Sequence, residues 1–149
     1  MQKETQNRNK ENMGANVANL VTHIIEGARS GRSLTDEDGE FMPAACFTIS
    51  PNGDIVKQRL YDTSGGGVLS VLQEEVGGYI ELFYRGPNFH FYCNEEGKLN
   101  GMEKNSLADC VTTAFMVSQG ALGCFNLVGP VCLVVDEKTA DEFMRGLDE

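Results

Sequence analysis

From residue 43 onward, the apolar residues of this chain lie in short segments separated by turn sequences, and this pattern limits the possible folds most. Five segments have the length and apolar content of strands: 45–50, 55–60, 79–84, 89–93 and 131–135. The first two flank Pro51-Asn52-Gly53-Asp54, and Asn-Gly is a strong β-hairpin signal. Together these segments and turns predict a sheet.

Helical spacing occurs between these strands. Residues 68–76 predict a short helix, which Gly77 and Gly78 end as a C-cap. Ser106-Leu107-Ala108-Asp109 fits a capping box for a helix that runs to about residue 119, and residues 136–147 predict a closing helix. The fold class is therefore α+β, with a single, largely antiparallel sheet of four to six strands and two or three packed helices.

The N-terminal part differs in composition. Residues 1–40 predict a polar extension, and residues 41–149 a compact domain. Within the extension, residues 1–12 are expected to be disordered, whereas apolar residues from Met13 to Ala28 recur at helical steps. This amphipathic helix would either pack on its own domain or serve for docking or self-association.

The balance of charge limits the choice of partner. Twelve basic and 22 acidic residues give a net charge of −10, which disfavours direct contact with nucleic acid and with anionic membranes. No apolar run reaches the roughly 20 residues that span a bilayer, and the polar first residues do not resemble a signal peptide. We therefore expect a cytoplasmic protein.

The chain has five cysteines, which are widely spaced and lie mostly in apolar surroundings. An odd number at such spacing favours free, buried thiols in a reducing compartment over a disulfide framework.

Motifs for catalysis or for cofactor binding are weak. Asp62-Thr63-Ser64-Gly65-Gly66-Gly67 precedes a helix, but no Lys-Ser or Lys-Thr follows as in a P-loop, so a flexible turn is favoured. His90 and Cys93 are three apart on a strand, which places them on opposite faces. The sequence therefore predicts no catalytic residue, no metal site and no cofactor, and it favours a non-enzymatic protein.

One charged residue stands out as a binding candidate. Glu81 interrupts an apolar strand, on the sheet face that Tyr79 and Phe83 share. One interpretation is that Glu81 is partly buried there, with a raised pKa and a direct functional role. The favoured interpretation is an ordinary exposed strand residue.

Three motifs occur in a familiar order: Leu72–Glu81 with Val-Gly-Gly-Tyr, Cys93–Gly101 with Asn-Glu-Glu-Gly-Lys, and Gly-Pro-Val at residues 129–131. Over residues 55–147 the chain resembles a small family found in phages, other viruses and bacteria, the domain of unknown function number 3846. The resemblance implies a helix that leads through Val-Gly-Gly into a strand, a hairpin at Asn-Glu-Glu-Gly-Lys, and a late strand that Gly129 and Pro130 open. The resemblance implies no activity. The positions that it carries over are Gly77, Gly78, Tyr79, Glu81, Asn94, Glu96, Gly97, Lys98 and Asn105.

Two functional hypotheses follow. The leading one is an accessory protein, encoded by a virus or a mobile element, that binds a host protein. The alternative is a small-molecule domain for a nucleotide-like ligand. The anchors of such a ligand would be polar and aromatic residues near the turns, namely Tyr79, Glu81, Asn94, Lys98 and Asn105. Glu96 is a further candidate binding residue. Gly77, Gly78, Gly97, Gly129 and Pro130 are predicted to form structural turns.

Overall fold

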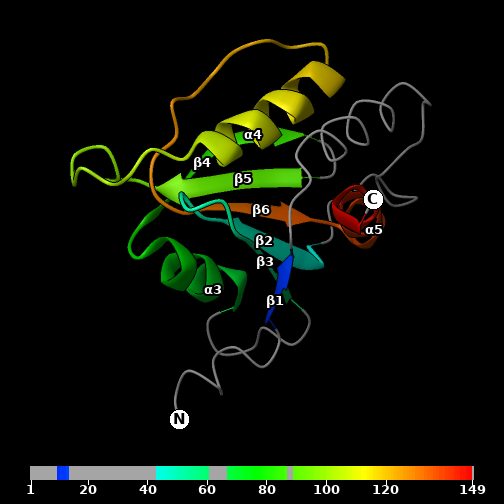
Figure 1. Ribbon diagram of the computed structural model, residues 1–149. Helices are drawn as coiled ribbons and strands as arrows, with labels where there is room; N and C mark the ends of the chain where they lie inside the picture. The colour runs from blue at the N-terminus through cyan, green and yellow to red at the C-terminus, as the bar shows by residue number, and fades with distance from the viewer. Residues whose placement is uncertain (1–9, 14–42, 61–66, 87–88, 149) are drawn as a thin grey trace.

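The computed structural model describes residues 10–13, 43–60, 67–86 and 89–148, and everything below concerns these residues (Figure 1). They form one six-stranded sheet in the order β1-β3-β2-β6-β5-β4, and every neighbouring pair is antiparallel. The strands are β1 Lys10–Met13, β2 Ala45–Ile49, β3 Ile55–Arg59, β4 Ile80–Gly86, β5 Phe89–Asn94 and β6 Val131–Val135. The helices are α3 Gly67–Val76, α4 Ser106–Ser118 and α5 Glu137–Asp148. The predicted α+β class is confirmed.

The β2–β3 hairpin forms where the sequence predicts it. Gly53 has a positive φ of 95° and donates its N–H to the carbonyl of Ser50 at 2.9 Å. The Asn52 side chain accepts the N–H of Asp54 at 3.0 Å. An Asn-Gly pair thus supplies both the local hydrogen bond and the backbone freedom that this tight turn requires.

Helices cover both faces of the sheet, with α3 on one side and α4 and α5 on the other (Figure 1). The face under α4 and α5 is rich in phenylalanine. Phe47 of β2 meets Phe143 of α5 with ring centroids 4.5 Å apart, and Phe89 of β5 meets Phe115 of α4 at 4.6 Å. Burying one such side chain stabilises the fold by about 1.5–3 kcal/mol, so these contacts fix both helices on the sheet.

The face under α3 has a smaller core. Leu72 and Val76 of α3 pack there against Cys46, Cys132 and Val134. Nearby, the buried hydroxyl of Thr48 donates to Oε1 of Glu75 at 2.8 Å, which ties the polar edge of α3 to the centre of the sheet.

All five cysteines are free. The prediction of buried thiols holds for Cys46 and Cys132, and Cys93 is half-buried. It is wrong for Cys110 and Cys124, which are exposed. Cys110 lies on the outer side of α4, and Cys124 lies in the loop before β6, where local apolar neighbours do not ensure burial.

The N-terminal extension contributes to the sheet. Lys10–Met13 form β1, which pairs with β3 from Lys10 opposite Gln58 to Met13 opposite Ile55. The prediction of disorder is therefore wrong for residues 10–12, and Met13 belongs to a strand rather than to a helix. An edge strand can form from polar residues because backbone hydrogen bonds hold it. The rest of the predicted disordered segment and the helix predicted up to Ala28 lie outside the described residues.

The ends of two helices show one confirmed cap and one corrected cap. Gly77 has a φ of 77° after α3, and the N–H groups of Gly77 and Gly78 both donate to the carbonyl of Gln73, as predicted for a C-cap. At α4 the capping box at Ser106 is wrong. Asn105 is the N-cap, and its side chain accepts the N–H of Ala108 at 3.0 Å. Asn and Ser are equally good N-caps, so two such residues in succession do not determine from the sequence where the helix begins.

The turn after β5 also differs from the family-based expectation of a hairpin. Residues 95–101 do form turns, and Asn94 accepts the N–H of Glu96 at 2.8 Å. The chain does not return along β5, however. Instead Lys104 pairs with Val128 in an isolated bridge, and α4 begins directly afterwards.

No helix in the described part of the chain combines the length and apolar character that crossing a bilayer requires.

Candidate functional site

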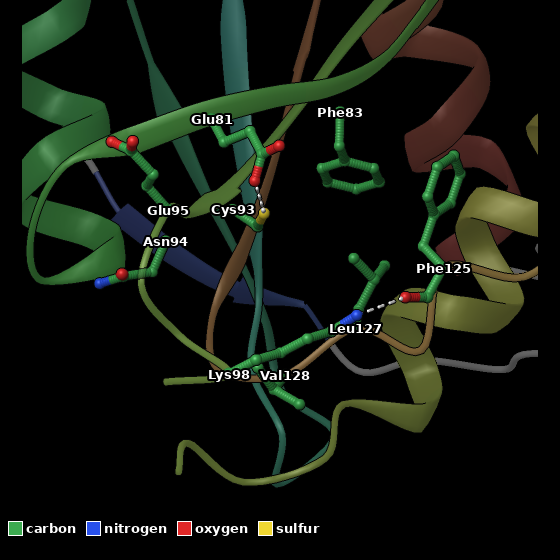
Figure 2. A pocket seen from close by; sticks show the side chains of 9 residues that line it. All are labelled: Glu81, Phe83, Cys93, Asn94, Glu95, Lys98, Phe125, Leu127 and Val128. Carbon is green, nitrogen blue, oxygen red and sulfur yellow. Dashed lines mark hydrogen bonds between the residues drawn. The ribbon is translucent and has the colours of Figure 1, made fainter. Parts of the chain in front are cut away.

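A hollow lies on the α4 side of the sheet, where β4 begins and β5 ends (Figure 2). Its volume is about 190 Å³. Strands β4 and β5, the turn that follows β5 and the loop that precedes β6 all contribute to it. Its lining consists of Glu81, Phe83, Cys93, Asn94, Glu95, Lys98, Phe125, Leu127 and Val128.

A β-bulge shapes the aromatic wall of the hollow. The register of β4 against β5 shifts between Leu82 and Tyr84. Phe83 and Tyr84 consequently both pack on the phenylalanine-rich core, although neighbours in a regular strand would face opposite sides. Phe83 meets Phe125 edge to face, with ring centroids 4.9 Å apart. The bulge thus adds the ring of Tyr84 to the core, where its centroid lies 6.1 Å from that of Phe125.

The loop that carries Phe125 is held by the start of α4. Asp109 accepts a hydrogen bond from the N–H of Leu127 through Oδ1 at 3.0 Å. Its Oδ2 forms an ion pair with Lys104. The N–H of Asn105 donates to the carbonyl of Leu127 at 2.9 Å. The far wall of the hollow is therefore positioned by hydrogen bonds to a helix, although it belongs to a loop.

Three charged side chains border the hollow, and all three are exposed: Glu81, Glu95 and Lys98. The favoured interpretation of Glu81 as an exposed strand residue is confirmed, and its partial burial is wrong. Glu81 lies on the predicted face with Phe83, but β4 is the edge strand of the sheet, so solvent reaches its side chain. Lys98 reaches across to donate from Nζ to the carbonyl of Phe125 at 3.2 Å (Figure 2).

The one thiol in the hollow is Cys93, whose Sγ lies 4.0 Å from Oε1 of Glu81. Burial, and secondly the charge of Glu81, raise the pKa of Cys93 to about 11, against a smaller opposing effect of Lys98. At neutral pH Cys93 is therefore a neutral thiol, and a thiolate nucleophile is disfavoured here. Among the described residues, no group of three or more histidine, cysteine or acidic side chains is arranged to hold a metal ion.

The predicted binding residues separate into two groups. Glu81, Asn94 and Lys98 meet in the hollow. Tyr79 is 68% exposed just before β4, and Glu96 is exposed in the turn; neither lines the hollow.

Asn105 is fully buried, so it does not offer its side chain to a ligand. Its Nδ2 donates to the carbonyls of Ile49 and Gly129, each at 2.8 Å. Asn94 is also mainly structural, because its Nδ2 donates to the carbonyl of Val76 at 3.0 Å. The candidate asparagines thus join segments of the fold.

Two of the predicted turn positions show why they are glycine. Gly129 has a φ of 69°, and a Cβ there would lie 2.6 Å from Sδ of Met102. A Cβ on the buried Gly97 would lie 3.1 Å from Cγ2 of Val128. These glycines let the turn after β5, which carries Lys98, approach the loop before β6, which carries Val128, and both of these side chains line the hollow.

The sequence prediction missed Glu95, Cys93 and the loop residues Phe125, Leu127 and Val128 as parts of one site. Only the apolar character of Phe125 and Leu127 within a glycine-rich loop hinted at a packed segment there. Their closeness to β4 depends on the path of the chain through α4.

Comparisons with known proteins assign the chain to a family and add no activity. The chain matches no curated protein and no solved structure. A family model described as a domain of unknown function, DUF3846, matches residues 46–145, which cover β2 through most of α5. This stretch is well over half of the chain and includes every residue that lines the hollow. The protein belongs to the DUF3846 family.

Proposed function

We propose that this protein is a non-enzymatic accessory protein, encoded by a virus or a mobile element, that acts in the host cytoplasm by binding a basic host protein. The hollow beside β4 is the centre of the proposed contact. Its carboxylates and rings suit a side chain that is both apolar and positively charged. The net charge of −10 supports the same kind of partner, because it attracts basic surfaces over a distance.

The observation that carries this proposal is the size and chemistry of the hollow. At about 190 Å³ it lies below the roughly 300–1,000 Å³ of typical small-molecule pockets, so a nucleotide would remain largely exposed. A single side chain of a partner protein matches this scale. Phe83 and Phe125 provide an aromatic surface, and Glu81 and Glu95 provide negative charge beside it.

Lys98 is the feature that would favour an anionic small molecule, which is the alternative function. Its Nζ already donates to the carbonyl of Phe125, and two carboxylates share the same border. Together with the acidic surface, these groups disfavour a phosphate ligand.

The test is photo-crosslinking in the cells that naturally produce the protein. A crosslinking amino acid replaces Leu99, which is 86% exposed and follows Lys98 directly. We expect one discrete protein adduct, reduced at least several-fold by Glu81→Gln or Phe125→Ala. The matched control is Glu74→Gln, an exposed charge on α3 across the sheet, which should leave the adduct unchanged.

Native mass spectrometry of the same gently purified protein separates the two functions. A discrete small-molecule mass increment that Phe125→Ala removes would contradict the proposal and support the small-molecule alternative. An adduct that forms equally with the hollow variants and the wild type would show that the contact lies elsewhere.

A further inference from the structure

We infer that the outer edge of β4 is a strand-pairing site, at which an extended segment of the basic partner adds to the sheet and places a lysine or arginine side chain in the hollow. This inference rests on the proposed function and specifies how the partner is held. It has three parts, which are a backbone edge, a side-chain hollow and a charge preference.

The backbone edge is defined by the hydrogen bonds of β4. The N–H of Glu95 donates to the carbonyl of Tyr79 at 2.9 Å, which makes Tyr79 and Glu95 a hydrogen-bonded pair. Hydrogen-bonded pairs alternate along antiparallel strands, so Glu81 and Cys93 form the next such pair. The backbone groups of Ile80 and Leu82 therefore point away from β5.

No strand within the described part of the chain pairs with that side of β4. The side chains next to it are accessible, since Leu82 is 42% exposed and Glu81 and Arg85 are exposed. Unpaired backbone groups on an edge strand readily accept an added strand, as in peptide recognition by β-augmentation.

The hollow adjoins this edge on one face of the sheet. Glu81 and Phe83 belong to β4 and line the hollow (Figure 2). Side chains of an added strand alternate between the two faces, and those on the α4 side would lie beside Glu81 and Phe83. One side chain of the added strand can thus enter the hollow while its backbone pairs with Ile80 and Leu82.

The chemistry of the hollow selects a cation. The carboxylates of Glu81 and Glu95 outnumber the one ammonium group among the described residues of the hollow, that of Lys98, which already donates to the carbonyl of Phe125. The rings of Phe83 and Phe125 accommodate a long aliphatic stem that ends in a positive charge. A second copy of this chain suits the edge less well, because it would bring another net charge of −10 against the same carboxylates.

The experiment uses the full chain and a defined probe, the capped pentapeptide Thr-Val-Arg-Val-Thr, in an amide chemical-shift titration by NMR. The comparison peptide has glutamate in place of arginine. We expect the arginine peptide to shift the amides of Ile80, Leu82 and the loop at 125–128, with an affinity roughly tenfold above that of the glutamate peptide. Glu81→Gln should reduce this preference several-fold.

Two variants at one position test the backbone edge. Leu82→Pro removes an N–H that points away from β5, and proline is tolerated at such edge positions, so the fold is retained. Leu82→Thr keeps the N–H and is the matched control. Circular dichroism checks that both fold. Peptide binding should be lost in Leu82→Pro and retained in Leu82→Thr.

Several outcomes would overturn the inference. Equal binding of both peptides would remove the charge preference, and unchanged binding to Leu82→Pro would remove the strand pairing. The absence of amide chemical-shift changes at millimolar peptide would also overturn the inference. In that case, a crosslinked partner protein that is lost in Phe125→Ala would still support the proposed function. A dimer that Leu82→Pro converts to monomer, without peptide binding, would assign the edge to self-association instead.

Discussion

The side-chain nitrogen of Asn105 lies 2.8 Å from the carbonyl oxygen of Ile49, which precedes it by 56 residues in the chain. The same nitrogen donates to the carbonyl of Gly129, and the side-chain oxygen caps α4. One buried amide therefore joins the end of β2, the start of α4 and the turn before β6. The three segments that it joins include the loop that forms one wall of the hollow.

Replacing this amide should destabilise the whole domain. Asn105→Ala removes the helix cap, which costs about 1 kcal/mol, and leaves two buried carbonyls with fewer donors, at about 1 kcal/mol or more each. We expect a loss of about 3 kcal/mol in the free energy of unfolding by urea denaturation. Asn100→Ala, at an exposed turn position, is the control and should change stability by about 0.5 kcal/mol or less. Equal stability of the two variants would contradict the structural role of Asn105.

Cys93 should react slowly with alkylating reagents despite its place in the hollow. Because its pKa is raised to about 11, little thiolate exists at neutral pH. Iodoacetamide labelling followed by peptide mass spectrometry should modify the exposed Cys110 and Cys124 well before Cys93. The pH of half-maximal labelling at Cys93 should fall in Glu81→Gln and rise in Lys98→Met, since the first charge raises the pKa and the second lowers it. Shifts in the same direction in both variants would contradict this electrostatic description.

The same raised pKa has a consequence for stability. The unfolded chain, with an ordinary thiol pKa, loses the proton first as the pH rises. The protonated Cys93 of the folded state thus contributes stability that declines between the ordinary pKa of about 9 and the folded value of about 11. In Cys93→Ala, the free energy of unfolding should therefore lack this part of the decline at alkaline pH.

His90 should titrate below the ordinary range of histidine. Partial burial, and secondly the positive charge of Arg85, lower the pKa of His90. Proton NMR should therefore give a midpoint below 6.5, and Arg85→Gln should raise it. Because the unfolded chain takes up the proton first, the wild type should lose stability relative to His90→Gln as the pH falls below about 6.5. A midpoint above 6.5 would contradict the burial of the ring.

Much of the fold follows from local sequence signals. Asn52-Gly53 predicts the β2–β3 hairpin and Gly77 the end of α3, because each motif satisfies its own backbone groups without help from distant residues. Local signals do not fix the start of α4, since Asn105 and Ser106 are both good caps. The structure selects Asn105 through its contacts with Ile49 and Gly129, which no local pattern reveals.

The candidate site was only partly predictable for a similar reason. Strand alternation places Glu81 and Phe83 on one face correctly, but it assigns Tyr84 to the opposite face, and the bulge reverses that assignment. The exposure of Glu81 depends on β4 being an edge strand, which the order of the sheet decides. Phe125 lies some 40 residues after Phe83 in sequence, and it joins the site only because the loop that follows α4 brings the chain back to β4.

The central position of β6 constrains how this chain can fold. β6 is the last strand in sequence, yet it lies between β2 and β5 and pairs with both. The two hairpins, β2–β3 and β4–β5, therefore remain separate until residues 131–135 are available. Such pairing over long sequence distances slows folding, because loop closure precedes the favourable contacts. During synthesis the sheet cannot be completed before residues 131–135 have left the ribosome, and a chain that stops before residue 131 lacks the strand that joins the two hairpins.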